Sequence, residues 1–350
     1  MGTRRLLRRA IGGAKRDRTA DLLHAMQALS QLSYSPTAGA NYRPGAPFCK
    51  PLRRSRCAYR PRARADFEIA LRVFRYHRQP SRAFRTPVPT SASQPQEFPR
   101  RLAGRVILIT GASGGLGSVL AMGCAAQGAT VVLHGRVVRK LKALYDRILA
   151  ADYPEPTILP LDLAIAEAED FANVASALQA QHGRVDAIVH TAVLLGSLGS
   201  IEHQAFDSWL ATLRVNLLAP FGLTRALLPL LRAAPDASVT FTLDTRGQEP
   251  KAFWGAYAVA KAGLSALLAI LADEWENVAT LRVNGVVPGP MRSPLRAQTH
   301  PGDDIRRLPS PDVFLPLYLY LISGQPKRES GVVIDGERWL RDAQARNPTP

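Results

Sequence analysis

A glycine-rich turn between an apolar run and a helix constrains the fold of this chain more than any other feature. Residues 105–110, "RVILIT", are typical of a buried strand, and the turn after them carries Gly111, Gly115 and Gly117 in the spacing G-x-x-x-G-x-G. Such a turn lets the backbone approach a pyrophosphate, and the N-terminus of the following helix favours negative charge. The alternative is that the glycines only tighten strand-to-helix packing. The order strand, turn, helix and second strand favours dinucleotide binding.

Further apolar runs of strand length alternate with amphipathic helical stretches along the rest of the chain. The runs cover residues 129–134, 157–163, 185–190, 237–243, 282–287 and 331–336, and the longest helical stretches lie near 207–232 and 255–276. Alternation of this kind indicates parallel pairing, and uninterrupted apolar strands indicate a sheet covered on both faces. The sequence therefore predicts an α/β domain over residues 99–345, a doubly wound parallel sheet (Rossmann fold) of about seven strands.

Residues 1–98 differ in composition from this domain. Residues 1–100 hold 21 Lys and Arg against 5 Asp and Glu, so +16 of the formal charge of +17 lies there and the remainder is balanced. Pro, Arg, Ser and Gly are frequent and apolar periodicity is weak, which is typical of disorder. Four interpretations stay open: an RNA-binding or acid-binding tail, an Arg-rich targeting peptide, a disordered extension without a function, and upstream DNA translated from a misplaced start codon.

The cysteines and the apolar runs restrict the class of protein. Cys49, Cys57 and Cys124 form no CxxC pair and no metal-ligand spacing, so we expect no disulfide framework, no metal site and a reducing, cytoplasmic location. No stretch approaches the ~20 apolar residues that a membrane span needs. A nucleic-acid partner is expected only if residues 1–98 are genuinely translated, which is the condition for a third interpretation as an RNA-binding protein.

Several motifs together resemble the short-chain dehydrogenase/reductase family. They are Thr110 with the glycine turn, Asn216, and Tyr257-x-x-x-Lys261, while "WGAYAVAK", "ADEWE", "LRVNGVVPG" and "LPLYLYLISG" are most similar to the YciK-like bacterial oxidoreductases. The resemblance covers residues 101 to about 340. It implies hydride transfer between a nicotinamide and a carbonyl or alcohol substrate. It also implies a homodimer or homotetramer, because the two long helical stretches correspond to those that form the family's subunit contact.

The resemblance also implies where the cofactor binds. In the glycine turn, the cofactor-binding residues are the three glycines with Ser113 and Leu116. At the ends of later strands they are Asp162 with Leu163, Thr191 with Ala192, and Pro288 with Gly289. The residue that would be acidic in an NAD enzyme is Gly135, and Arg136 follows it. A guanidinium there can pair with a 2′-phosphate, so NADP is favoured over NAD. The alternatives are a solvated Arg136 at a strand end and an Asp162 that only caps a turn.

The catalytic residues implied by the resemblance are Tyr257, Lys261 and Asn216. Positions four apart on a helix share one face, so the tyrosine and the lysine can point into the same cleft. The lysine ammonium and the nicotinamide would lower the pKa of the tyrosine, which acts as the general acid/base. The lysine also binds the ribose hydroxyls, and the asparagine supports a proton path to the lysine.

Two positions depart from the family pattern. Asp244 stands thirteen residues before Tyr257, where the family has a serine that donates to the substrate oxygen. An ionised aspartate has no donor, would repel developing negative charge and would raise the pKa of the tyrosine. The hydroxyl of Thr245 could replace the serine only with a bend in the backbone. The second departure lies in Thr191-Ala192-Val193, where the family has Asn-Ala-Gly, so that Val193 replaces a glycine beside the nicotinamide. The leading hypothesis is an active oxidoreductase, and the alternative is a nucleotide-binding protein without turnover.

Overall fold

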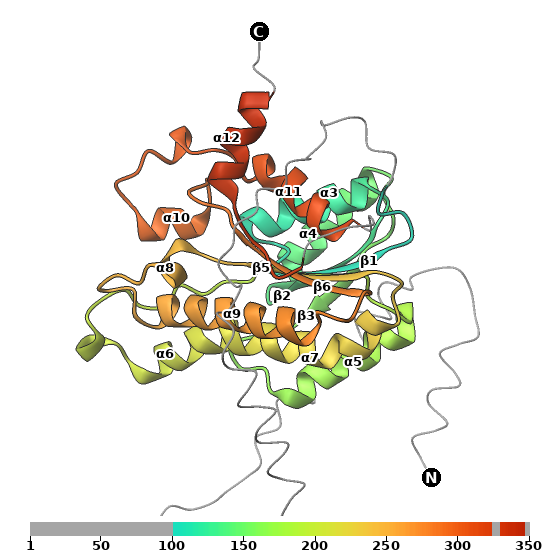
Figure 1. The fold of residues 1–350 in the computed structure, drawn as a ribbon, viewed down its shortest axis with the longest axis horizontal. Coiled ribbons are helices and arrows are strands. Elements are labelled where there is room, and N and C mark those ends of the chain that lie inside the picture. The colour runs from blue at the N-terminus through green and yellow to red at the C-terminus, as the bar shows by residue number, and fades with distance from the viewer. Residues whose placement is uncertain (1–100, 324–329, 347–350) are drawn as a thin grey trace, which may run out of the picture. The chain divides into compact units, whose positions relative to one another are not determined.

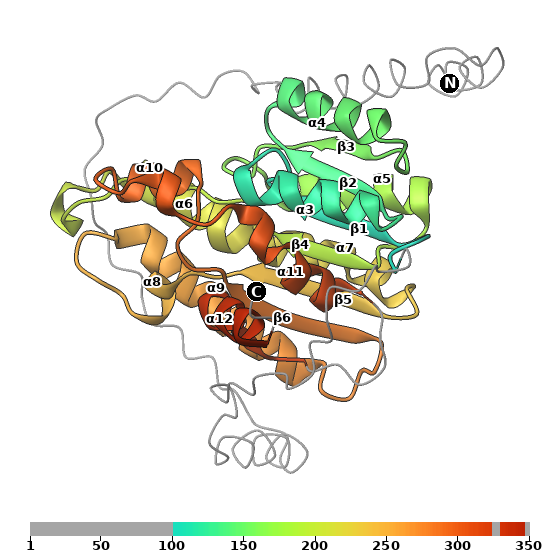
Figure 2. The ribbon, with the colours of Figure 1, turned by 90° about the horizontal axis from the view of Figure 1, so that it is seen from above.

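Seven parallel strands form one sheet in the order β3-β2-β1-β4-β5-β6-β7 (Figures 1 and 2). The computed structural model describes residues 101–323 and 330–346. From β1 the chain proceeds outward to β3, then returns to β4 and continues to β7, so the strand order reverses between β1 and β4, where ligands bind in such sheets. The doubly wound Rossmann fold is thereby confirmed. The interpretations of residues 1–98 lie outside the described residues.

The strands coincide with the apolar runs of the sequence. Their bounds are β1 Val106–Thr110, β2 Thr130–Gly135, β3 Thr157–Pro160, β4 Ala187–His190, β5 Ala237–Thr242, β6 Leu281–Val287 and β7 Val333–Asp335. The longest register joins β5 to β6, from Ala237 opposite Leu281 to Thr242 opposite Val286. The central strands are buried on both faces, which explains why they lack polar alternation.

Helices cover both faces of the sheet (Figure 1). One face carries α3 (Gly115–Ala126), α4 (Val138–Ala150) and α11 (Leu315–Ile322); the other carries α5 (Ala168–His182), α7 (Ala219–Arg232) and α9 (Gly255–Glu274). The remaining helices are α6 (Phe206–Leu213), α8 (Thr245–Gln248), α10 (Pro294–Thr299) and α12 (Gly336–Arg346). Short 3₁₀ turns span Ile201–His203, Ile305–Arg307 and Pro311–Phe314. The predicted helix near 207–232 is α6 and α7, joined by a π-turn at Arg214–Leu218.

The main core lies between the sheet and the face formed by α3, α4 and α11. Its members are aliphatic and aromatic side chains withdrawn from water, among them Ile107, Ile109, Val131, Leu133, Leu120, Cys124, Leu141, Leu144, Leu317 and Tyr318. Burial of this apolar surface is the main stabilising contribution to the domain. It fixes the strands whose carboxyl ends carry the candidate site.

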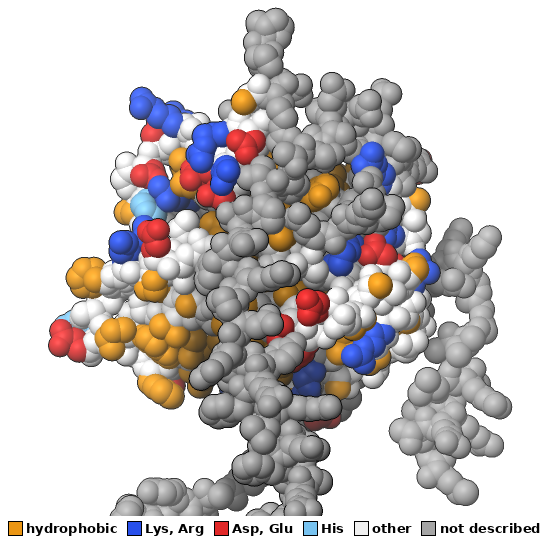
Figure 3. Space-filling model, in the orientation of Figure 1, with side chains coloured by type: hydrophobic (Ala, Val, Ile, Leu, Met, Phe, Trp, Pro, Cys, Tyr) orange, Lys and Arg blue, Asp and Glu red, His pale blue; other side chains and the backbone are white. Residues whose placement is uncertain are grey.

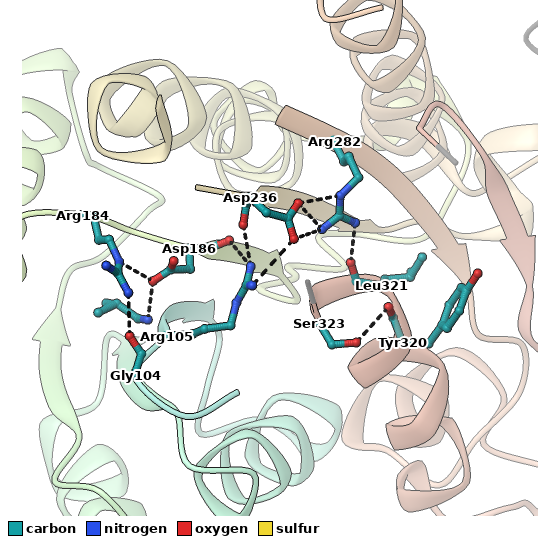
Figure 4. Close-up of polar contacts among 10 residues, drawn as sticks. Gly104, Arg105, Arg184, Asp186, Asp236, Arg282, Tyr320, Leu321 and Ser323 are labelled. Carbon is teal, nitrogen blue, oxygen red and sulfur yellow. Dashed lines mark hydrogen bonds and ion pairs between the residues drawn. The ribbon is translucent and has the colours of Figure 1, made fainter. Parts of the chain in front are cut away.

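A network of ion pairs joins the amino ends of the central strands (Figure 4). Arg282 of β6 binds the carboxylate of Asp236 with Nε and Nη2, at 2.8 to 3.0 Å. Arg105 donates to the backbone oxygen of Asp236 at 2.5 Å and lies 3.6 Å from its carboxylate. Asp186, before β4, accepts from the backbone N–H of Val106 at 2.8 Å. The network therefore links β1, β4, β5 and β6 at the edge opposite the candidate site.

Helix α9 is long and apolar enough to cross a membrane by length and composition, with a mean hydropathy of 1.6 over its most apolar window. From the sequence we expect no apolar stretch as long as a membrane span, but by length and composition this helix is one. The helix packs against β6 and α6, and a core helix of an α/β domain meets the same criterion. That packing buries 39% of the apolar window.

Candidate active site

The glycine turn lies at the carboxyl end of β1 and has no room for side chains at two of its positions. Gly111 has a φ of +66°, and a β-carbon there would lie 2.8 Å from the Cα of Ala192. A β-carbon on Gly117 would lie 2.3 Å from the carbonyl oxygen of Gly111. Gly115 differs, because a β-carbon there would meet only ordinary contacts at 3.7 Å. Gly111 and Gly117 are thus required by the fold, while packing within the protein does not require a glycine at position 115.

The turns after β1 and β4 are held together by hydrogen bonds. Thr110 Oγ1 accepts from the backbone N–H groups of Thr191 and Ala192, both at 3.1 Å, and the Thr191 hydroxyl donates to the Thr110 carbonyl oxygen. The threonine that replaces the family asparagine thus ties two strand ends together at the switch point. Val193, the second departure from the pattern, keeps 39% of its surface exposed at the rim.

The end of β2 combines a hydroxyl with an exposed guanidinium. A β-carbon on Gly135 would lie 3.6 Å from Ser113 Oγ, so the serine of the glycine turn reaches the strand end, and the next residue, Arg136, is exposed. Among the predicted residues of the next strand, Asp162 accepts from the backbone N–H of Ala164 at 3.0 Å, which is the turn-capping contact of the alternative interpretation. Leu163 is buried, as is Leu116 of the glycine turn.

Tyr257 and Lys261 lie one turn apart on α9 and are both buried. Lys261 Nζ donates to the carbonyl oxygen of Thr242 at 2.8 Å, at the end of β5, and lies 5.8 Å from the centre of the Tyr257 ring. Burial lowers the pKa of Lys261 to about 8, although the negative charge of Asp244 opposes this change. The buried ammonium group thus releases its proton more readily than a lysine in water.

Asn216 occupies the π-turn between α6 and α7. Its amide donates to the carbonyl oxygens of Leu194, at 2.6 Å, and Thr212, at 2.8 Å, and its Oδ1 accepts from the backbone N–H of Leu194 at 3.2 Å. The side chain therefore binds a carbonyl of α6 as well as the loop after β4. It also holds the loop after β4 in place beside the cleft.

Asp244 contacts the tyrosine directly. Tyr257 Oη donates to Asp244 Oδ2 at 2.8 Å, and Asp244 Oδ1 accepts from the backbone N–H of Arg246 at 2.8 Å, as the N-cap of α8. The pKa of Tyr257 is raised well above 10, first by burial, then by the charge of Asp244 and its hydrogen bond. This is the direction expected from the sequence. The Thr245 hydroxyl lies 3.5 Å from Asp244 Oδ1, so Asp244 and not Thr245 meets the phenol.

Short-range packing fixes the position of α8 against α9. A β-carbon on Gly247 would lie 2.6 Å from the carbonyl carbon of Lys261, so this glycine permits the close approach. Trp254 has its ring centre 5.8 Å from that of Tyr257, and the Arg246 guanidinium lies 5.0 Å from the Trp254 ring. The cation–π contact of Arg246 is not apparent from the sequence, since it depends on how the loop before α9 folds back.

The loop after β6 lies at the open side of the cleft. Pro288 is buried, Gly289 has a φ of +81°, and a β-carbon on Gly289 would lie 2.5 Å from the side chain of Glu337 at the start of α12. Ser293 caps α10 by accepting from the backbone N–H of Arg296 at 3.1 Å, and Ser293 and Pro294 are the nearest neighbours of Gly115. The segment after β6 thus contains the short helix α10, whose first residues lie against the glycine turn.

Two buried histidines beneath the cleft are not predicted from the sequence. His134 of β2 has its Nδ1 3.4 Å from the backbone N–H of Gly111, and His190 of β4 bonds the Thr224 hydroxyl at 3.1 Å and stacks on Phe241. Burial lowers their pKa values, to about 4 for His134 and about 3 for His190. Their strands read as continuously apolar, so only the three-dimensional packing reveals them.

The chain is similar in sequence and fold to known short-chain dehydrogenases. The model of the family described as short chain dehydrogenase matches residues 105–304. The uncharacterized oxidoreductase YciK of Escherichia coli K12 is 36% identical over 236 residues, which is 67% of this chain and 93% of that protein. Two solved short-chain dehydrogenases are similar in fold. One, from Shigella flexneri 2a and complexed with NADP, has 35% identity and a TM-score of 0.66 and covers 69% of this chain and 100% of its own. The other, from Escherichia coli CFT073 and complexed with NADPH, has 36% identity and a TM-score of 0.65 and covers 68% and 99%.

Proposed function

We propose that this chain, which belongs to the short-chain dehydrogenase family, is an NADP-dependent oxidoreductase that acts on a polar double bond and its reduced form, with a carbonyl/alcohol pair as the class the family suggests. The observation that carries the proposal is the buried Tyr257–Lys261 pair at the carboxyl ends of the strands, in a fold whose first strand ends in a glycine turn that opens helix α3. Bound nicotinamide would supply the hydride chemistry.

The preference for NADP is supported from two sides. Two similar proteins have been solved with NADP or NADPH. In this chain the end of β2 presents Arg136 and the hydroxyl of Ser113, with no carboxylate at Gly135 to repel a 2′-phosphate. The pyrophosphate would lie at the N-terminus of α3, and Lys261 would hold the ribose hydroxyls.

The chain's own residues would manage the proton. Tyr257 is the donor or acceptor, Lys261 delivers positive charge close to its ring, and Asn216 holds the loop at the inner end of the cleft. Asp244 opposes this arrangement, because its carboxylate already accepts a hydrogen bond from the phenolic hydroxyl. That hydrogen bond favours a second candidate function, a nucleotide-binding protein without turnover.

A comparison of three proteins separates the two candidates. NADPH oxidation is measured on a panel of carbonyl compounds with the full chain, Tyr257→Phe and Asp244→Ser, and NADPH affinity is measured for each. Turnover by the full chain that is lost in Tyr257→Phe at unchanged NADPH affinity supports an enzyme. Carbonyl turnover in Asp244→Ser alone, with no compound of another class reduced by the full chain, supports the binding protein. A full chain that does not bind NADPH contradicts both.

A homodimer or homotetramer is part of the proposal. Hydrophobic side chains gather on the side of the molecule where α6 and α9 lie (Figure 3). Large exposed hydrophobic residues on α6, the π-turn, α7 and α9 are Phe206, Leu218, Phe221, Val259 and Ile270. Exposed apolar surface of this kind marks a protein contact. Light scattering at micromolar concentration should show at least a dimer, and Ile270→Glu should weaken it; a monomeric full chain would contradict the assignment.

A further inference from the structure

The carboxylate of Asp244 lies where the family has a hydroxyl donor for the substrate oxygen, so it bears on the kind of substrate. Both its oxygens accept hydrogen bonds, Oδ2 from Tyr257 Oη and Oδ1 from the backbone N–H of Arg246, each at 2.8 Å. These contacts fix the group at the mouth of the buried tyrosine and lysine pair. An ionised carboxylate presents only hydrogen-bond acceptors to a substrate.

Its charge is not cancelled by an ion pair. Among residues 101–323 and 330–346, no lysine or arginine side chain forms a salt bridge with Asp244. Lys261 Nζ is directed to the Thr242 carbonyl oxygen, and the Arg246 guanidinium lies over Trp254. The carboxylate therefore lies beside the reacting position without a direct ion pair, and Lys261 is a positive group that interacts with it at longer range.

This charge discriminates between two kinds of reducible double bond. Reduction of a carbonyl builds negative charge on oxygen, which a neighbouring carboxylate opposes and which needs a proton from Tyr257. A protonated carbon–nitrogen double bond brings a positive charge and an N–H donor, both of which the carboxylate attracts. The negative charge of Asp244 thus disfavours reduction of a carbonyl and favours binding of an iminium.

We propose that the substrate reduced at this site is a protonated imine, whose N–H⁺ donates to Asp244, and that the reverse reaction oxidises an amine. The inference rests on the proposed NADP-dependent function and names its substrate class. The iminium carbon accepts the hydride, the π electron pair of the C=N bond becomes the lone pair of nitrogen, and the cation becomes a neutral amine while NADPH becomes NADP⁺. No proton is transferred in that step, so the tightly held proton of Tyr257 is not required.

The test compares a cyclic imine, dihydroisoquinoline, with a bicyclic ketone of similar size, tetralone, as oxidants of NADPH. The full chain should favour the imine by more than about a hundredfold in kcat/KM, and Asp244→Ser should lower that ratio by about the same factor. The serine keeps the N-cap of α8, so the variant should fold. Tyr257→Phe should abolish ketone reduction by Asp244→Ser, because the phenol is the proton donor for a ketone. The permanently charged N-methyl iminium should be reduced without dependence on substrate protonation.

The inference is overturned if the full chain reduces the ketone as well as the imine, or if Asp244→Ser leaves the ratio unchanged. Where no compound is reduced, binding to the NADP⁺-loaded protein decides. A cyclic amine that binds at least tenfold tighter to the full chain than to Asp244→Ser supports the inference, and equal binding contradicts it. Failure of NADPH itself to bind removes the proposed function, and the inference falls with it.

Discussion

Tyr257 Oη donates a hydrogen bond of 2.8 Å to Asp244 Oδ2. The hydroxyl proposed to donate a proton to the substrate is therefore already hydrogen-bonded to another side chain. Lys261, one turn further on α9, donates to a backbone carbonyl and approaches the ring at 5.8 Å. The pKa of Tyr257 therefore depends on the balance between the negative charge of Asp244, which raises it, and the positive charge of Lys261, which would lower it.

Replacement of Asp244 by serine should lower the pKa of Tyr257. Burial is the larger cause of its elevation and remains, but the charge and the hydrogen bond of the aspartate are removed. Phenolate absorbance, taken as the difference from a matched Tyr257→Phe protein, should appear at lower pH in Asp244→Ser than in the unchanged chain. An unchanged titration would show that Asp244 does not act on the phenol.

Arg136 should select the phosphorylated cofactor. Arg136→Ala should weaken NADPH binding by about tenfold and leave NADH binding nearly unchanged, because only the 2′-phosphate loses its charge-assisted partner. Calorimetry with each nucleotide measures the effect. Arg147→Ala, at the exposed far end of α4, is the matched control and should alter neither affinity. Equal losses for both nucleotides would place Arg136 elsewhere on the cofactor.

The glycines of the turn should separate into structural and binding residues. Gly117→Ala places a β-carbon 2.3 Å from the Gly111 oxygen and should lower the free energy of unfolding by about 2 kcal/mol or more. Gly115→Ala meets only contacts at 3.7 Å and should keep its stability while losing NADPH affinity. Denaturant unfolding and nucleotide titration measure the two effects. Normal NADPH affinity in Gly115→Ala would show that the turn does not cradle a pyrophosphate.

Asp236→Asn should destabilise the domain by about 3 kcal/mol, since it leaves two largely buried guanidinium groups without their carboxylate. Burial already lowers the pKa of Arg105, and Asp186 and Asp236 counter that effect. Asp304→Asn is the control, because the Asp304 ion pairs with Arg306 and Arg307 are exposed and asparagine can still cap the turn. Urea unfolding of both variants should give a large loss for the first and nearly none for the second.

The buried histidines should make the domain sensitive to acid. Their folded pKa values of about 4 and about 3 lie below the ordinary 6.5, so the unfolded chain binds protons that the folded protein does not. Their contribution is complete above pH 6.5 and is lost as pH falls toward the folded values. Melting temperature followed from pH 7 to pH 4 should fall, and less steeply in His190→Gln than in the unchanged chain. The exposed His203→Gln should retain the full slope.

Much of the fold could be predicted because the strands of a doubly covered sheet are apolar without interruption. The run 105–110 and β1, Val106–Thr110, differ by one residue. The continuous helix expected near 207–232 is interrupted because Asn216 takes the carbonyl of Thr212, a contact made by one side chain that periodicity does not report. The buried His134 and His190 were missed for a related reason, since burial of a polar group depends on partners from other strands.

The site could be predicted in its residues but not in its hydrogen bonds. Spacing on a helix brings Tyr257 and Lys261 to one face in any α-helix. The direct bond from Tyr257 to Asp244 depends instead on the N-cap conformation of α8, with a φ of −150° and a ψ of 146° at Asp244. Thr191 appears from the sequence as a departure at the cofactor, and its hydroxyl proves to hold the end of β1. Both outcomes depend on side-chain torsions that the sequence leaves open.

The ion network of Arg105, Asp236 and Arg282 lies at the amino ends of the strands, and the residues proposed for chemistry lie at their carboxyl ends. The sheet thus keeps the group that anchors its strands about a strand's length from the group that defines its reactivity. An exchange of serine for aspartate at position 244 alters charge at one edge without disturbing the anchor at the other. A substitution at the carboxyl ends of the strands can therefore change the substrate that is accepted while the ion pairs that anchor the sheet remain intact.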